Sequence, residues 1–510
     1  MLTFLGHALR MGRAGFVLAR EGAFKDFDAR GLPPVAIAGV RVANLLARPG
    51  ANSATGLSTA IDRLGPSYVK LGQFLGTRPD IVGPKLAAQL ERLQDRMAPA
   101  PREFAVRRVE QAFDRPIDEV FVEFGEAVAA ASIAQVHRAK VRDADGTLRE
   151  VAVKILRPGV ERRFRRDLED MFFAARLAER FDRDLRRLKL VQVVETLARS
   201  MRMEMDFRLE AAAAAEFADN IADDPDYRSP RVDWDRTARE VFTMEWIEGV
   251  QASDPAVLER LGFDAPALGR KIVQSFLRHA LYEGFFHADM HPGNFLVDAE
   301  GRIVALDFGI MGRLGLKERR FLAEILYGFI RRDYLRIAEV HFEAGYVPRV
   351  YRVEDFAQAM RAIGEPIHAR PADQISMAKL LTLLFEVTAL FDMQTRLELV
   401  MLQKTMVVVE GVARKLDPRL DMWRTAEPVV GAWIAGNLGP KGRLEDLGAA
   451  ARELAREAAS APARLAKLGR WIDSWPEMET RAEKDGGMVF AALCVIAFAL
   501  IWIAVRLTFH

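Results

Sequence analysis

The sequence has very little cysteine and almost no excess charge, and both absences limit its function. Its single cysteine, Cys494, excludes a disulfide framework and any zinc or iron–sulfur site made from several cysteines. The 510 residues include 73 Lys and Arg against 71 Asp and Glu, so the charge balance does not indicate nucleic acid as the main partner. No Gly-x-Gly-x-x-Gly pattern is present, which disfavours a flavin or nicotinamide enzyme.

The chain does contain one long apolar run, residues 488–505. These 18 residues include no charged side chain, and at ~1.5 Å per residue they would span about 27 Å, close to the ~30 Å of a bilayer core. Five basic residues lie between Arg464 and Lys484, whereas Arg506 is the only lysine or arginine after the run. The positive-inside rule then places the larger N-terminal part in the cytoplasm. The run predicts a single transmembrane anchor; the alternative is a buried core helix.

The rest of the chain changes pattern along its length. The first hundred residues have apolar positions at helical spacing, and arginines interrupt the first 22 residues, which favours an amphipathic helix over a signal peptide. Strand-like runs begin at Phe121, and two of them flank a turn at Asp143–Gly146, which predicts an antiparallel pair. Helical patterns follow over 160–220 and a strand over 241–249. The remainder to about 425 is mostly helical, with short strands and loops near 285–310.

Lys154 is the first residue that could take part in chemistry, because it stands in an otherwise apolar strand. Alternation would place its ammonium on one face, while Val153 and Ile155 pack on the other. Such a lysine needs a carboxylate, a phosphate or solvent as partner. Taken alone the pattern is weak evidence, since lysines are common on exposed strand edges.

The segment from His287 to Asn294 is more specific. Asp289 and Asn294 are five residues apart, and Pro292 and Gly293 force the chain between them to turn. Phosphoryl transfer uses such a pair, a carboxylate to orient the attacking oxygen and an amide oxygen to help hold magnesium. The two histidines of the segment offer a metal site as the alternative, although zinc usually requires a third protein ligand.

The third motif is Asp307-Phe308-Gly309, directly after the strand-like residues 303–306. An aspartate at the end of a strand suits a magnesium ligand that faces phosphates, because hard cations prefer oxygen ligands. The tripeptide alone can arise by chance at a strand exit. The order of the three motifs, however, is that of a protein-kinase nucleotide site. The sequence therefore predicts a kinase-like site that uses ATP and Mg²⁺.

Further motifs give the chain a resemblance to a known family. The run Ala129–His137 looks like the alanine-rich loop of the UbiB family of atypical protein-kinase-like proteins, which are linked to ubiquinone biosynthesis. Lys70–Gln73 resembles the KxGQ motif of that family, and Glu204–Asp206 resembles its ExD motif. Its C-terminal signature is similar to Lys404, Glu410-Gly411, Arg414 and Leu416-Asp417-Pro418. The resemblance covers nearly the whole chain, although bacterial members often have two membrane segments and this sequence has one.

The resemblance implies an α+β, two-lobed protein-kinase-like fold with an N-terminal helical extension and a C-terminal transmembrane helix. The expected domains are the extension with the KxGQ motif (1–110), the kinase-like N-lobe (111–250), the helical C-lobe (251–425), a connector (426–486) and the anchor (487–505).

It also implies roles for individual residues. Lys154 would bind the α- and β-phosphates and pair with Glu210, Asn294 and Asp307 would hold Mg²⁺, and Asp289 would orient the attacking group. Lys154, Glu210 and Asp289 are thus the expected catalytic residues. The expected ATP-binding residues are Ala129, Ala130, Ala131, Ser132, Ile133, Ala134, Gln135, Val136, Lys154 and, in the hinge, Glu245. The expected regulatory residues are Lys70, Gly72, Gln73, Glu204 and Asp206.

The implied function is a membrane-anchored, kinase-like ATPase that is required for or regulates ubiquinone biosynthesis and supports its 2-polyprenylphenol hydroxylation stage. Expected partners are ATP, polyprenyl-phenol quinone precursors, quinone-biosynthesis enzymes and membrane lipid, with no nucleic acid. The expected location is the cell inner membrane, with the kinase-like part cytoplasmic. Phosphorylation of proteins is less expected, because the KxGQ extension would cover the cleft. The alternative is a scaffold or chaperone of quinone-biosynthesis enzymes that nucleotide stabilises without phosphoryl transfer.

Overall fold

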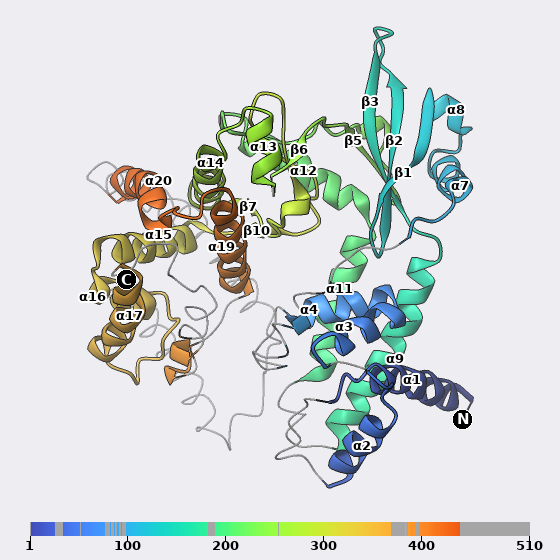
Figure 1. Ribbon diagram of the computed structural model, residues 1–510, viewed down its shortest axis with the longest axis horizontal. Helices are drawn as coiled ribbons and strands as arrows, with labels where there is room; N and C mark the ends of the chain where they lie inside the picture. Colours follow the sequence, from blue (N-terminus) through green and yellow to red (C-terminus); the bar gives the residue numbers. More distant parts are fainter. Residues whose placement is uncertain are drawn as a thin grey trace, which may run out of the picture. The chain divides into compact units, whose positions relative to one another are not determined.

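A computed structural model shows the architecture of most of the chain (Figure 1). It describes residues 2–25, 34–50, 53–76, 98–181, 189–252, 254–368 and 397–438, with isolated positions within 82–93 and 383–393. The chain divides into two units, Met1–Ile434 and Ala435–His510, and nearly all of the second lies outside the described residues. The predicted anchor at 488–505 lies there too. Within the described residues, no helix is both long and apolar enough to cross a membrane.

The N-terminal extension is helical, as the spacing of its apolar residues predicts. It contains α1 (Leu2–Arg20), α2 (Pro34–Leu45), α3 (Ser53–Leu64) and α4 (Pro66–Gly76). Gly65 separates α3 from α4 with φ +98°, a conformation that favours glycine, and Pro66 then begins α4. A small core, to which Ile61, Val69 and Leu93 belong, holds this region together.

A four-stranded antiparallel sheet follows, in the order β1-β2-β3-β5. Its strands are β1 (Glu123–Ala130), β2 (Ala134–Arg142), β3 (Leu148–Leu156) and β5 (Val241–Glu245). The predicted antiparallel pair around Asp143–Gly146 is confirmed, since β2 and β3 pair from Ala134↔Leu156 to Arg142↔Leu148. Two helices, α7 (Arg102–Phe113) and α8 (Ile117–Val120), lie beside this sheet (Figure 1), and α7 contributes Ala105 and Val109 to its core.

Between β3 and β5 the chain forms the helices expected over 160–220. These are α9 (Val160–Phe181), α11 (Leu190–Glu204) and α12 (Phe207–Asn220). Helix α9 packs against α1, α4 and α11, and therefore joins the extension to the rest of the unit. Helix α12 contains a run of alanines, which have the highest helix propensity, and Asp206 caps its N-terminus by accepting a hydrogen bond from the Arg208 N–H.

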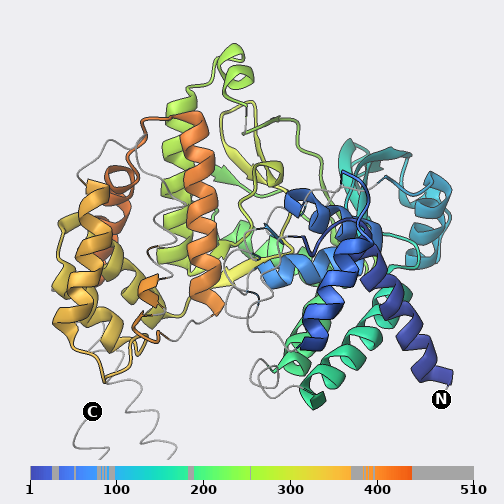
Figure 2. The ribbon, with the colours of Figure 1, turned by 60° about the horizontal axis from the view of Figure 1, so that its bottom comes forward.

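The C-terminal lobe is mainly helical, as predicted, with short strands in the loop region. Its principal helices are α13 (Pro255–Arg260), α14 (Ala265–Arg278), α15 (Leu316–Arg331), α16 (Tyr334–Glu343), α17 (Val353–His368), α19 (Leu397–Leu416) and α20 (Met422–Asn437). Helices α14 and α19 lie side by side (Figure 2). Gly269 permits this approach, because a Cβ at that position would stand 3.0 Å from the Ala413 carbonyl oxygen.

Short strands before and within this lobe form two small sheets. β4 (Tyr227–Arg228), β9 (Ile303–Ala305), β8 (Phe295–Val297) and β6 (Val250–Gln251) make one sheet in that order, and β10 (Met311–Arg313) pairs with β7 (Phe285–His287) in the other. Strands β7, β8 and β9 have fully or nearly buried apolar residues. They fix the ends of the loops that contain Asp289 and Asp307.

Candidate active site

Lys154 lies at the centre of the candidate site. It is on β3, which is an inner strand between β2 and β5, so the alternative of an exposed edge lysine is wrong. Its neighbours Val153 and Ile155 are completely buried in the core of the sheet, as the alternation predicts. The ammonium points instead toward two carboxylates, with Nζ 2.6 Å from Oε1 of Glu210 and 3.5 Å from Oδ1 of Asp307. It also lies 5.6 Å from the centre of the Phe207 ring.

Glu210 reaches Lys154 from the first turns of α12. Its side chain is only 8% exposed, and burial raises the pKa of Glu210 to about 7 against the opposing attraction of Lys154. Burial would lower the pKa of Lys154, but the two carboxylates raise it above its ordinary value. Glu210 and Asp307 thus both face the Lys154 ammonium, and as the pH falls Glu210, the more buried of the two, is protonated first.

Asp307 follows β9 and is the more open of the two carboxylates, with 47% of its side chain exposed. Partial burial would raise the pKa of Asp307, but Lys154, the backbone N–H of Gly309 and the more distant charge of Lys70 hold it well below its usual range. The Gly309 N–H donates to Oδ1 at 3.0 Å. Asp307 is therefore an accessible carboxylate that stays ionised, as a cation ligand must.

Hydrogen bonds join the Asp289 loop to Asp307. The N–H of Asp289 donates to Nδ1 of His287 at 3.1 Å, so the proton of this buried imidazole is on Nε2, which donates to the carbonyl oxygen of Asp307. Burial lowers the pKa of His287, in agreement with a neutral ring. The Nδ2 amide of Asn294 donates to the backbone oxygen of Asp289 at 3.0 Å and to its Oδ2 at 3.3 Å. The structure therefore brings Asp289, Asn294 and Asp307 together.

A residue that sequence reasoning missed also supports this loop. Thr405, on α19, is 1% exposed, and its hydroxyl donates to the carbonyl oxygen of Ala288 at 3.0 Å while lying 2.8 Å from the Met401 carbonyl of its own helix. The Ala288 N–H donates to the Ile310 carbonyl. Both backbone groups of the residue before Asp289 are therefore fixed, and no local motif around Thr405 indicates this contact.

The alanine-rich segment forms the tight connection between β1 and β2. Ala129 and Ala130 pair with Val136 and Gln135, and only residues 131–133 lie between the strands. None of the residues in this connection has a positive φ, so alanine fits its backbone where a more strained loop would need glycine. Arg157 braces the connection, because its guanidinium donates to the Ala131 carbonyl at 3.1 Å.

Gln135 and Val136 have different surroundings. The Gln135 side chain accepts from the Ala100 N–H at 2.8 Å and also contacts Nε2 of His137, so it ties the segment before α7 to β2. Val136 is the cross-strand partner of Lys154. Ser132, Ile133 and Ala134 are buried. These contacts give the segment a fixed shape next to Lys154, whereas its contact with ATP stays a prediction.

The KxGQ motif lies on α4, and its Lys70 contacts the ExD motif. Its Nζ is 2.7 Å from Oε2 of Glu204, the last residue of α11, and both side chains are largely buried. A Cβ on Gly72 would stand 2.4 Å from a Leu93 methyl, so this glycine allows close packing inside the extension. Asp206 does not join the Lys70 pair; it caps α12 and pairs with Arg208 at 2.7 Å. Gln73 also lies on α4.

Glu245 ends β5, where the predicted hinge, residues 245–249, begins. Its side chain turns to Arg228, 2.6 Å away, and to the N–H of Arg231. Its carboxylate is therefore engaged in structural contacts, which leaves backbone groups of the hinge as the candidates for adenine contacts. Gly249, at the other end of the hinge, lies against β8, because a Cβ there would stand 2.7 Å from the Val297 carbonyl oxygen.

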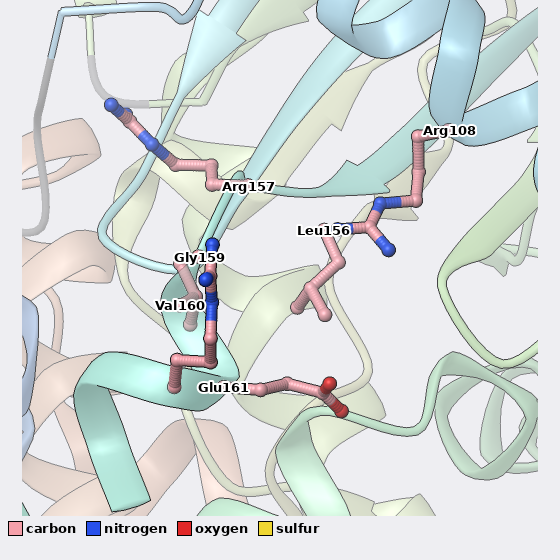
Figure 3. Close-up of a pocket in the computed structure, with 7 residues that line it drawn as sticks. Arg108, Leu156, Arg157, Gly159, Val160 and Glu161 are labelled. Atoms are coloured by element: carbon pink, nitrogen blue, oxygen red, sulfur yellow. The ribbon is translucent and has the colours of Figure 1, made fainter. Parts of the chain in front are cut away.

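A small cavity lies between the end of β3 and the start of α9. It has a volume of about 110 Å³, and Arg108, Arg157, Glu161 and Arg162 are among the residues around it (Figure 3). Two of these side chains already form ion pairs, Arg108 with Glu240 and Glu161 with Arg239. Neither Lys154 nor Asp307 lines this cavity, so it is separate from the candidate site.

The oxygen donors of the site are suited to magnesium. Mg²⁺ usually binds to one or two protein carboxylates and completes its octahedron with phosphate and water oxygens. Asp307 offers one ionised carboxylate, and Asn294, whose Nδ2 is used in hydrogen bonds, keeps its Oδ1 for a cation. Within the described residues, no group of three or more His, Cys, Asp or Glu side chains could hold a metal ion by itself.

The sheet, the central lysine with its glutamate, and the two loops that carry Asp289 and Asp307 define a protein of the kinase-like class. Comparison with family models agrees: the ABC1 atypical kinase-like domain matches residues 92–341, and the UbiB helical domain matches residues 360–421. The chain belongs to the UbiB family, and the resemblance noted in its motifs is confirmed.

Individual relatives support the assignment. A protein named Probable protein kinase UbiB from Marinobacter nauticus is 39% identical, over 79% of this chain and 74% of its own length. A protein of the same name from Histophilus somni is 38% identical, over 76% and 72% of the two chains. The solved structure of the Rv3197–erythromycin complex from Mycobacterium tuberculosis is 24% identical and covers 80% of this chain and 98% of that one, with a TM-score of 0.46.

Proposed function

We propose that this protein is a membrane-anchored ATPase or small-molecule kinase that supports ubiquinone biosynthesis at the stage of 2-polyprenylphenol hydroxylation. The observation that carries the proposal is the position of the Lys154 ammonium, 2.6 Å from Glu210 and 3.5 Å from Asp307. Lys154 and Glu210 form the pair that positions a lysine for nucleotide phosphates in kinases, and Asp307 is the ionised carboxylate that a phosphate-bound cation needs.

The proposed roles follow from these contacts. Asp307 and Asn294 would hold Mg²⁺, and the bound ion would neutralise charge on the phosphates. Lys154 would bind the α- and β-phosphates, and Glu210 would hold it in place. Asp289 would orient the attacking hydroxyl or water, since its carboxylate is held near Asn294 and its backbone is fixed by His287.

The extension favours a small acceptor or water over a protein substrate. Lys70 connects α4 to the end of α11 through Glu204, and its charge is close enough to contribute to the lowered pKa of Asp307. We propose that α4, in this place, restricts access to the phosphate side of the candidate site. We therefore propose that Lys70, Gly72, Gln73, Glu204 and Asp206 regulate access.

The quinone context and the anchor rest on family membership and on sequence. Polyprenyl-phenol precursors are very apolar, so an anchored ATPase could make their head groups accessible to soluble enzymes of the pathway. The proposed anchor is the apolar run 488–505, with the kinase-like part in the cytoplasm at the inner membrane. The domain boundaries given above, from the extension at 1–110 to the anchor, are part of the same proposal.

The test is phosphate release from magnesium ATP by the full chain in detergent and in liposomes, with and without phenolic analogues of quinone precursors. Asp307→Asn and Asp289→Ala are compared with Asp235→Asn, a surface aspartate with no hydrogen bond or ion pair in the described part of the chain. We expect turnover that rises with lipid or phenol. Asp289→Ala should lower it by ~100-fold or more, since a positioned acid–base group contributes about that much, and Asp307→Asn should lower it because an amide does not replace the ionised carboxylate as a Mg²⁺ ligand. The control should retain wild-type turnover.

Two outcomes would refute the enzymatic proposal. Turnover that survives in Asp307→Asn would place the metal elsewhere. Nucleotide binding without turnover, together with an Asp289→Ala protein that still restores quinone synthesis in cells lacking the wild-type protein, would support the scaffold alternative.

A further inference from the structure

Two polar side chains are buried on the face of β2 that packs against α7. Gln135 is 1% exposed and His137 is 0% exposed. Lys154 lies on the other face of the sheet, because its cross-strand partner is Val136 and neighbouring residues of a strand point to opposite faces. The residues of β3 that pair with Gln135 and His137 are apolar. Amide and imidazole groups are costly in such surroundings unless their donors and acceptors are satisfied.

The Gln135 side chain is bonded to the linker that leads from the extension to α7. Its Oε1 accepts from the Ala100 N–H at 2.8 Å, and its Nε2 donates to the Ala100 carbonyl oxygen at 3.3 Å. Ala100 stands between Pro99 and Pro101, which have no N–H, so its amide is the one backbone donor of residues 99–101. The two prolines also restrict the backbone of this linker. Gln135 therefore holds a stiff segment by its single donor.

His137 fixes the orientation of the Gln135 amide. The Gly125 carbonyl oxygen can only accept, so Nδ1 of His137, 2.9 Å away, has the proton of the ring. Nε2 of His137 is then an acceptor, and Nε2 of Gln135 donates to it at 2.8 Å. At the other end of the amide, the Ala100 N–H can only donate and requires Oε1. These groups are all satisfied in one arrangement, and that arrangement requires a neutral His137.

The surroundings of His137 favour the neutral ring. Burial lowers the pKa of His137 below its ordinary value, against the backbone hydrogen bond and the charge of Glu126 on β1, and the charge of Arg102 at the start of α7 adds to the lowering. The Phe124 ring of β1 stacks on the imidazole with 4.7 Å between ring centres, and the residue opposite on β3, Val153, is apolar. A proton on Nε2 would also meet the Gln135 amide nitrogen, which is a donor.

We propose that Gln135 is a positioning residue of the nucleotide site and acts through the alanine-rich connection between β1 and β2. Gln135 is the second residue of β2, directly after that connection, and it pairs with Ala130 at the end of β1. His137 supports β1 as well, because its partner Gly125 lies where the pairing of β1 with β2 shifts register. The two strands that hold the connection are thus fixed to each other and to the linker.

The effect on nucleotide passes through the backbone. The Gln135 side chain lies on the face of the sheet opposite to Lys154, whereas residues 131–133 connect the two strands next to the site. Loss of the Gln135 amide would free the start of β2 and the linker together, and would weaken nucleotide binding while the contacts of Lys154 with Glu210 and Asp307 remain. The inference rests on the proposed function, since it requires that ATP binds beside this connection.

Nucleotide binding at several pH values tests this inference in the full chain in detergent. A fluorescent, non-hydrolysable ATP analogue is titrated with Mg²⁺ into wild type, Gln135→Glu and Gln135→Met between about pH 8 and pH 6, the range in which a histidine beside a carboxylate titrates. Gln111→Glu, at an exposed position of α7, is the matched control. Each Kd is divided by the wild-type Kd at the same pH, so that titration of other groups, such as Glu210, cancels.

We expect Gln135→Met to raise Kd about tenfold at every pH, because leaving a buried donor or acceptor without its partner has an effect of that order. Gln135→Glu should raise Kd about as much near pH 8, where its carboxylate faces the acceptor Nε2 of His137. Near pH 6, one proton shared by the carboxylate and the imidazole restores the missing donor, and the ratio should return to within about twofold of one. A purely structural glutamine would change the urea midpoint but not this pH-dependent ratio.

Hydrogen exchange of the Ala100 amide extends the test to the unsubstituted protein, in case the variants fail to fold. Because Pro99 and Pro101 have no amide hydrogen, the exchange of residues 99–101 reports on this N–H alone. Saturating analogue should slow it about threefold or more, since the linker and the connection are held together. The Tyr346 amide, which donates to the His341 carbonyl in the C-terminal lobe, should exchange at an unchanged rate.

The outcomes separate this inference from the proposed function. Wild-type protein that binds the analogue without any change in exchange at Ala100 would overturn the inference alone. The same conclusion would follow if both Gln135 variants bound the analogue as wild type does, or if their Kd ratios ran in parallel from pH 8 to pH 6. Wild-type protein that binds no analogue at any pH would refute the proposed ATP site and this inference with it.

Discussion

Replacement of Thr405 by valine tests whether α19 supports the Asp289 loop. The two side chains have nearly the same shape, so the change removes a hydroxyl without opening a cavity. It leaves the Ala288 carbonyl, in a residue that is 7% exposed, without the donor that lies 3.0 Å away. A buried polar group that loses its partner costs about 1–3 kcal/mol. The hydroxyl shares its one proton with the Met401 carbonyl, so we expect the lower half of that range.

The loss should appear in two measurements on the full chain. The urea midpoint should shift to lower concentration, and kcat for ATP hydrolysis should fall about tenfold, the equivalent of ~1.4 kcal/mol in the transition state. KM for ATP should stay near the wild-type value, because the contacts of Lys154 and Asp307 do not involve α19. Thr405→Ser keeps the donor and removes one methyl group, so it should cost less than about 1 kcal/mol and retain kcat. A valine variant with wild-type kcat, or a serine variant as impaired as valine, would contradict the reasoning.

Three further predictions concern stability. His341 is packed between aromatic rings, and burial lowers its pKa from 6.5 to about 4, so below about pH 6.5 the unfolded chain binds a proton that the folded chain does not. The free energy of unfolding should therefore fall, by at most ~3 kcal/mol, as the pH drops from about 6.5 to 4. His341→Phe should remove this loss in urea titrations at several pH values. Gly72→Ala should destabilise by ~1–3 kcal/mol, seen as faster proteolysis of the extension, because its Cβ would stand 2.4 Å from a methyl of Leu93. Lys70→Glu should destabilise the extension, and adding Glu204→Lys should restore much of the lost stability in a double-mutant cycle. If the double variant loses more free energy of unfolding than the two single variants together, the 2.7 Å contact is not a pair interaction.

Much of the site was predictable because its residues occur in short motifs at the ends of predicted strands. Alternation around Lys154 indicated its face of β3, and the turn forced by Pro292 and Gly293 indicated that Asp289 and Asn294 lie together. Buried apolar residues fix the ends of the strands. The residues that directly follow a strand are therefore confined to a small region of space. Local pattern and tertiary structure then agree, which is the condition for reading a site from sequence.

The contacts that could not be predicted join elements far apart in the sequence. Thr405 and Ala288 are separated by 117 residues, and His7 and Asp170 by 163. Within a helical pattern, a buried threonine and a buried leucine occupy the same kind of position, so periodicity cannot reveal that one of them donates to the Asp289 loop. The same holds for Asp170, which reads as one charge in an arginine-rich helix until the packing of α1 against α9 gives it partners. Sequence motifs therefore indicate which groups perform chemistry, whereas the residues that hold those groups in position emerge only when helices from distant parts of the chain are packed together.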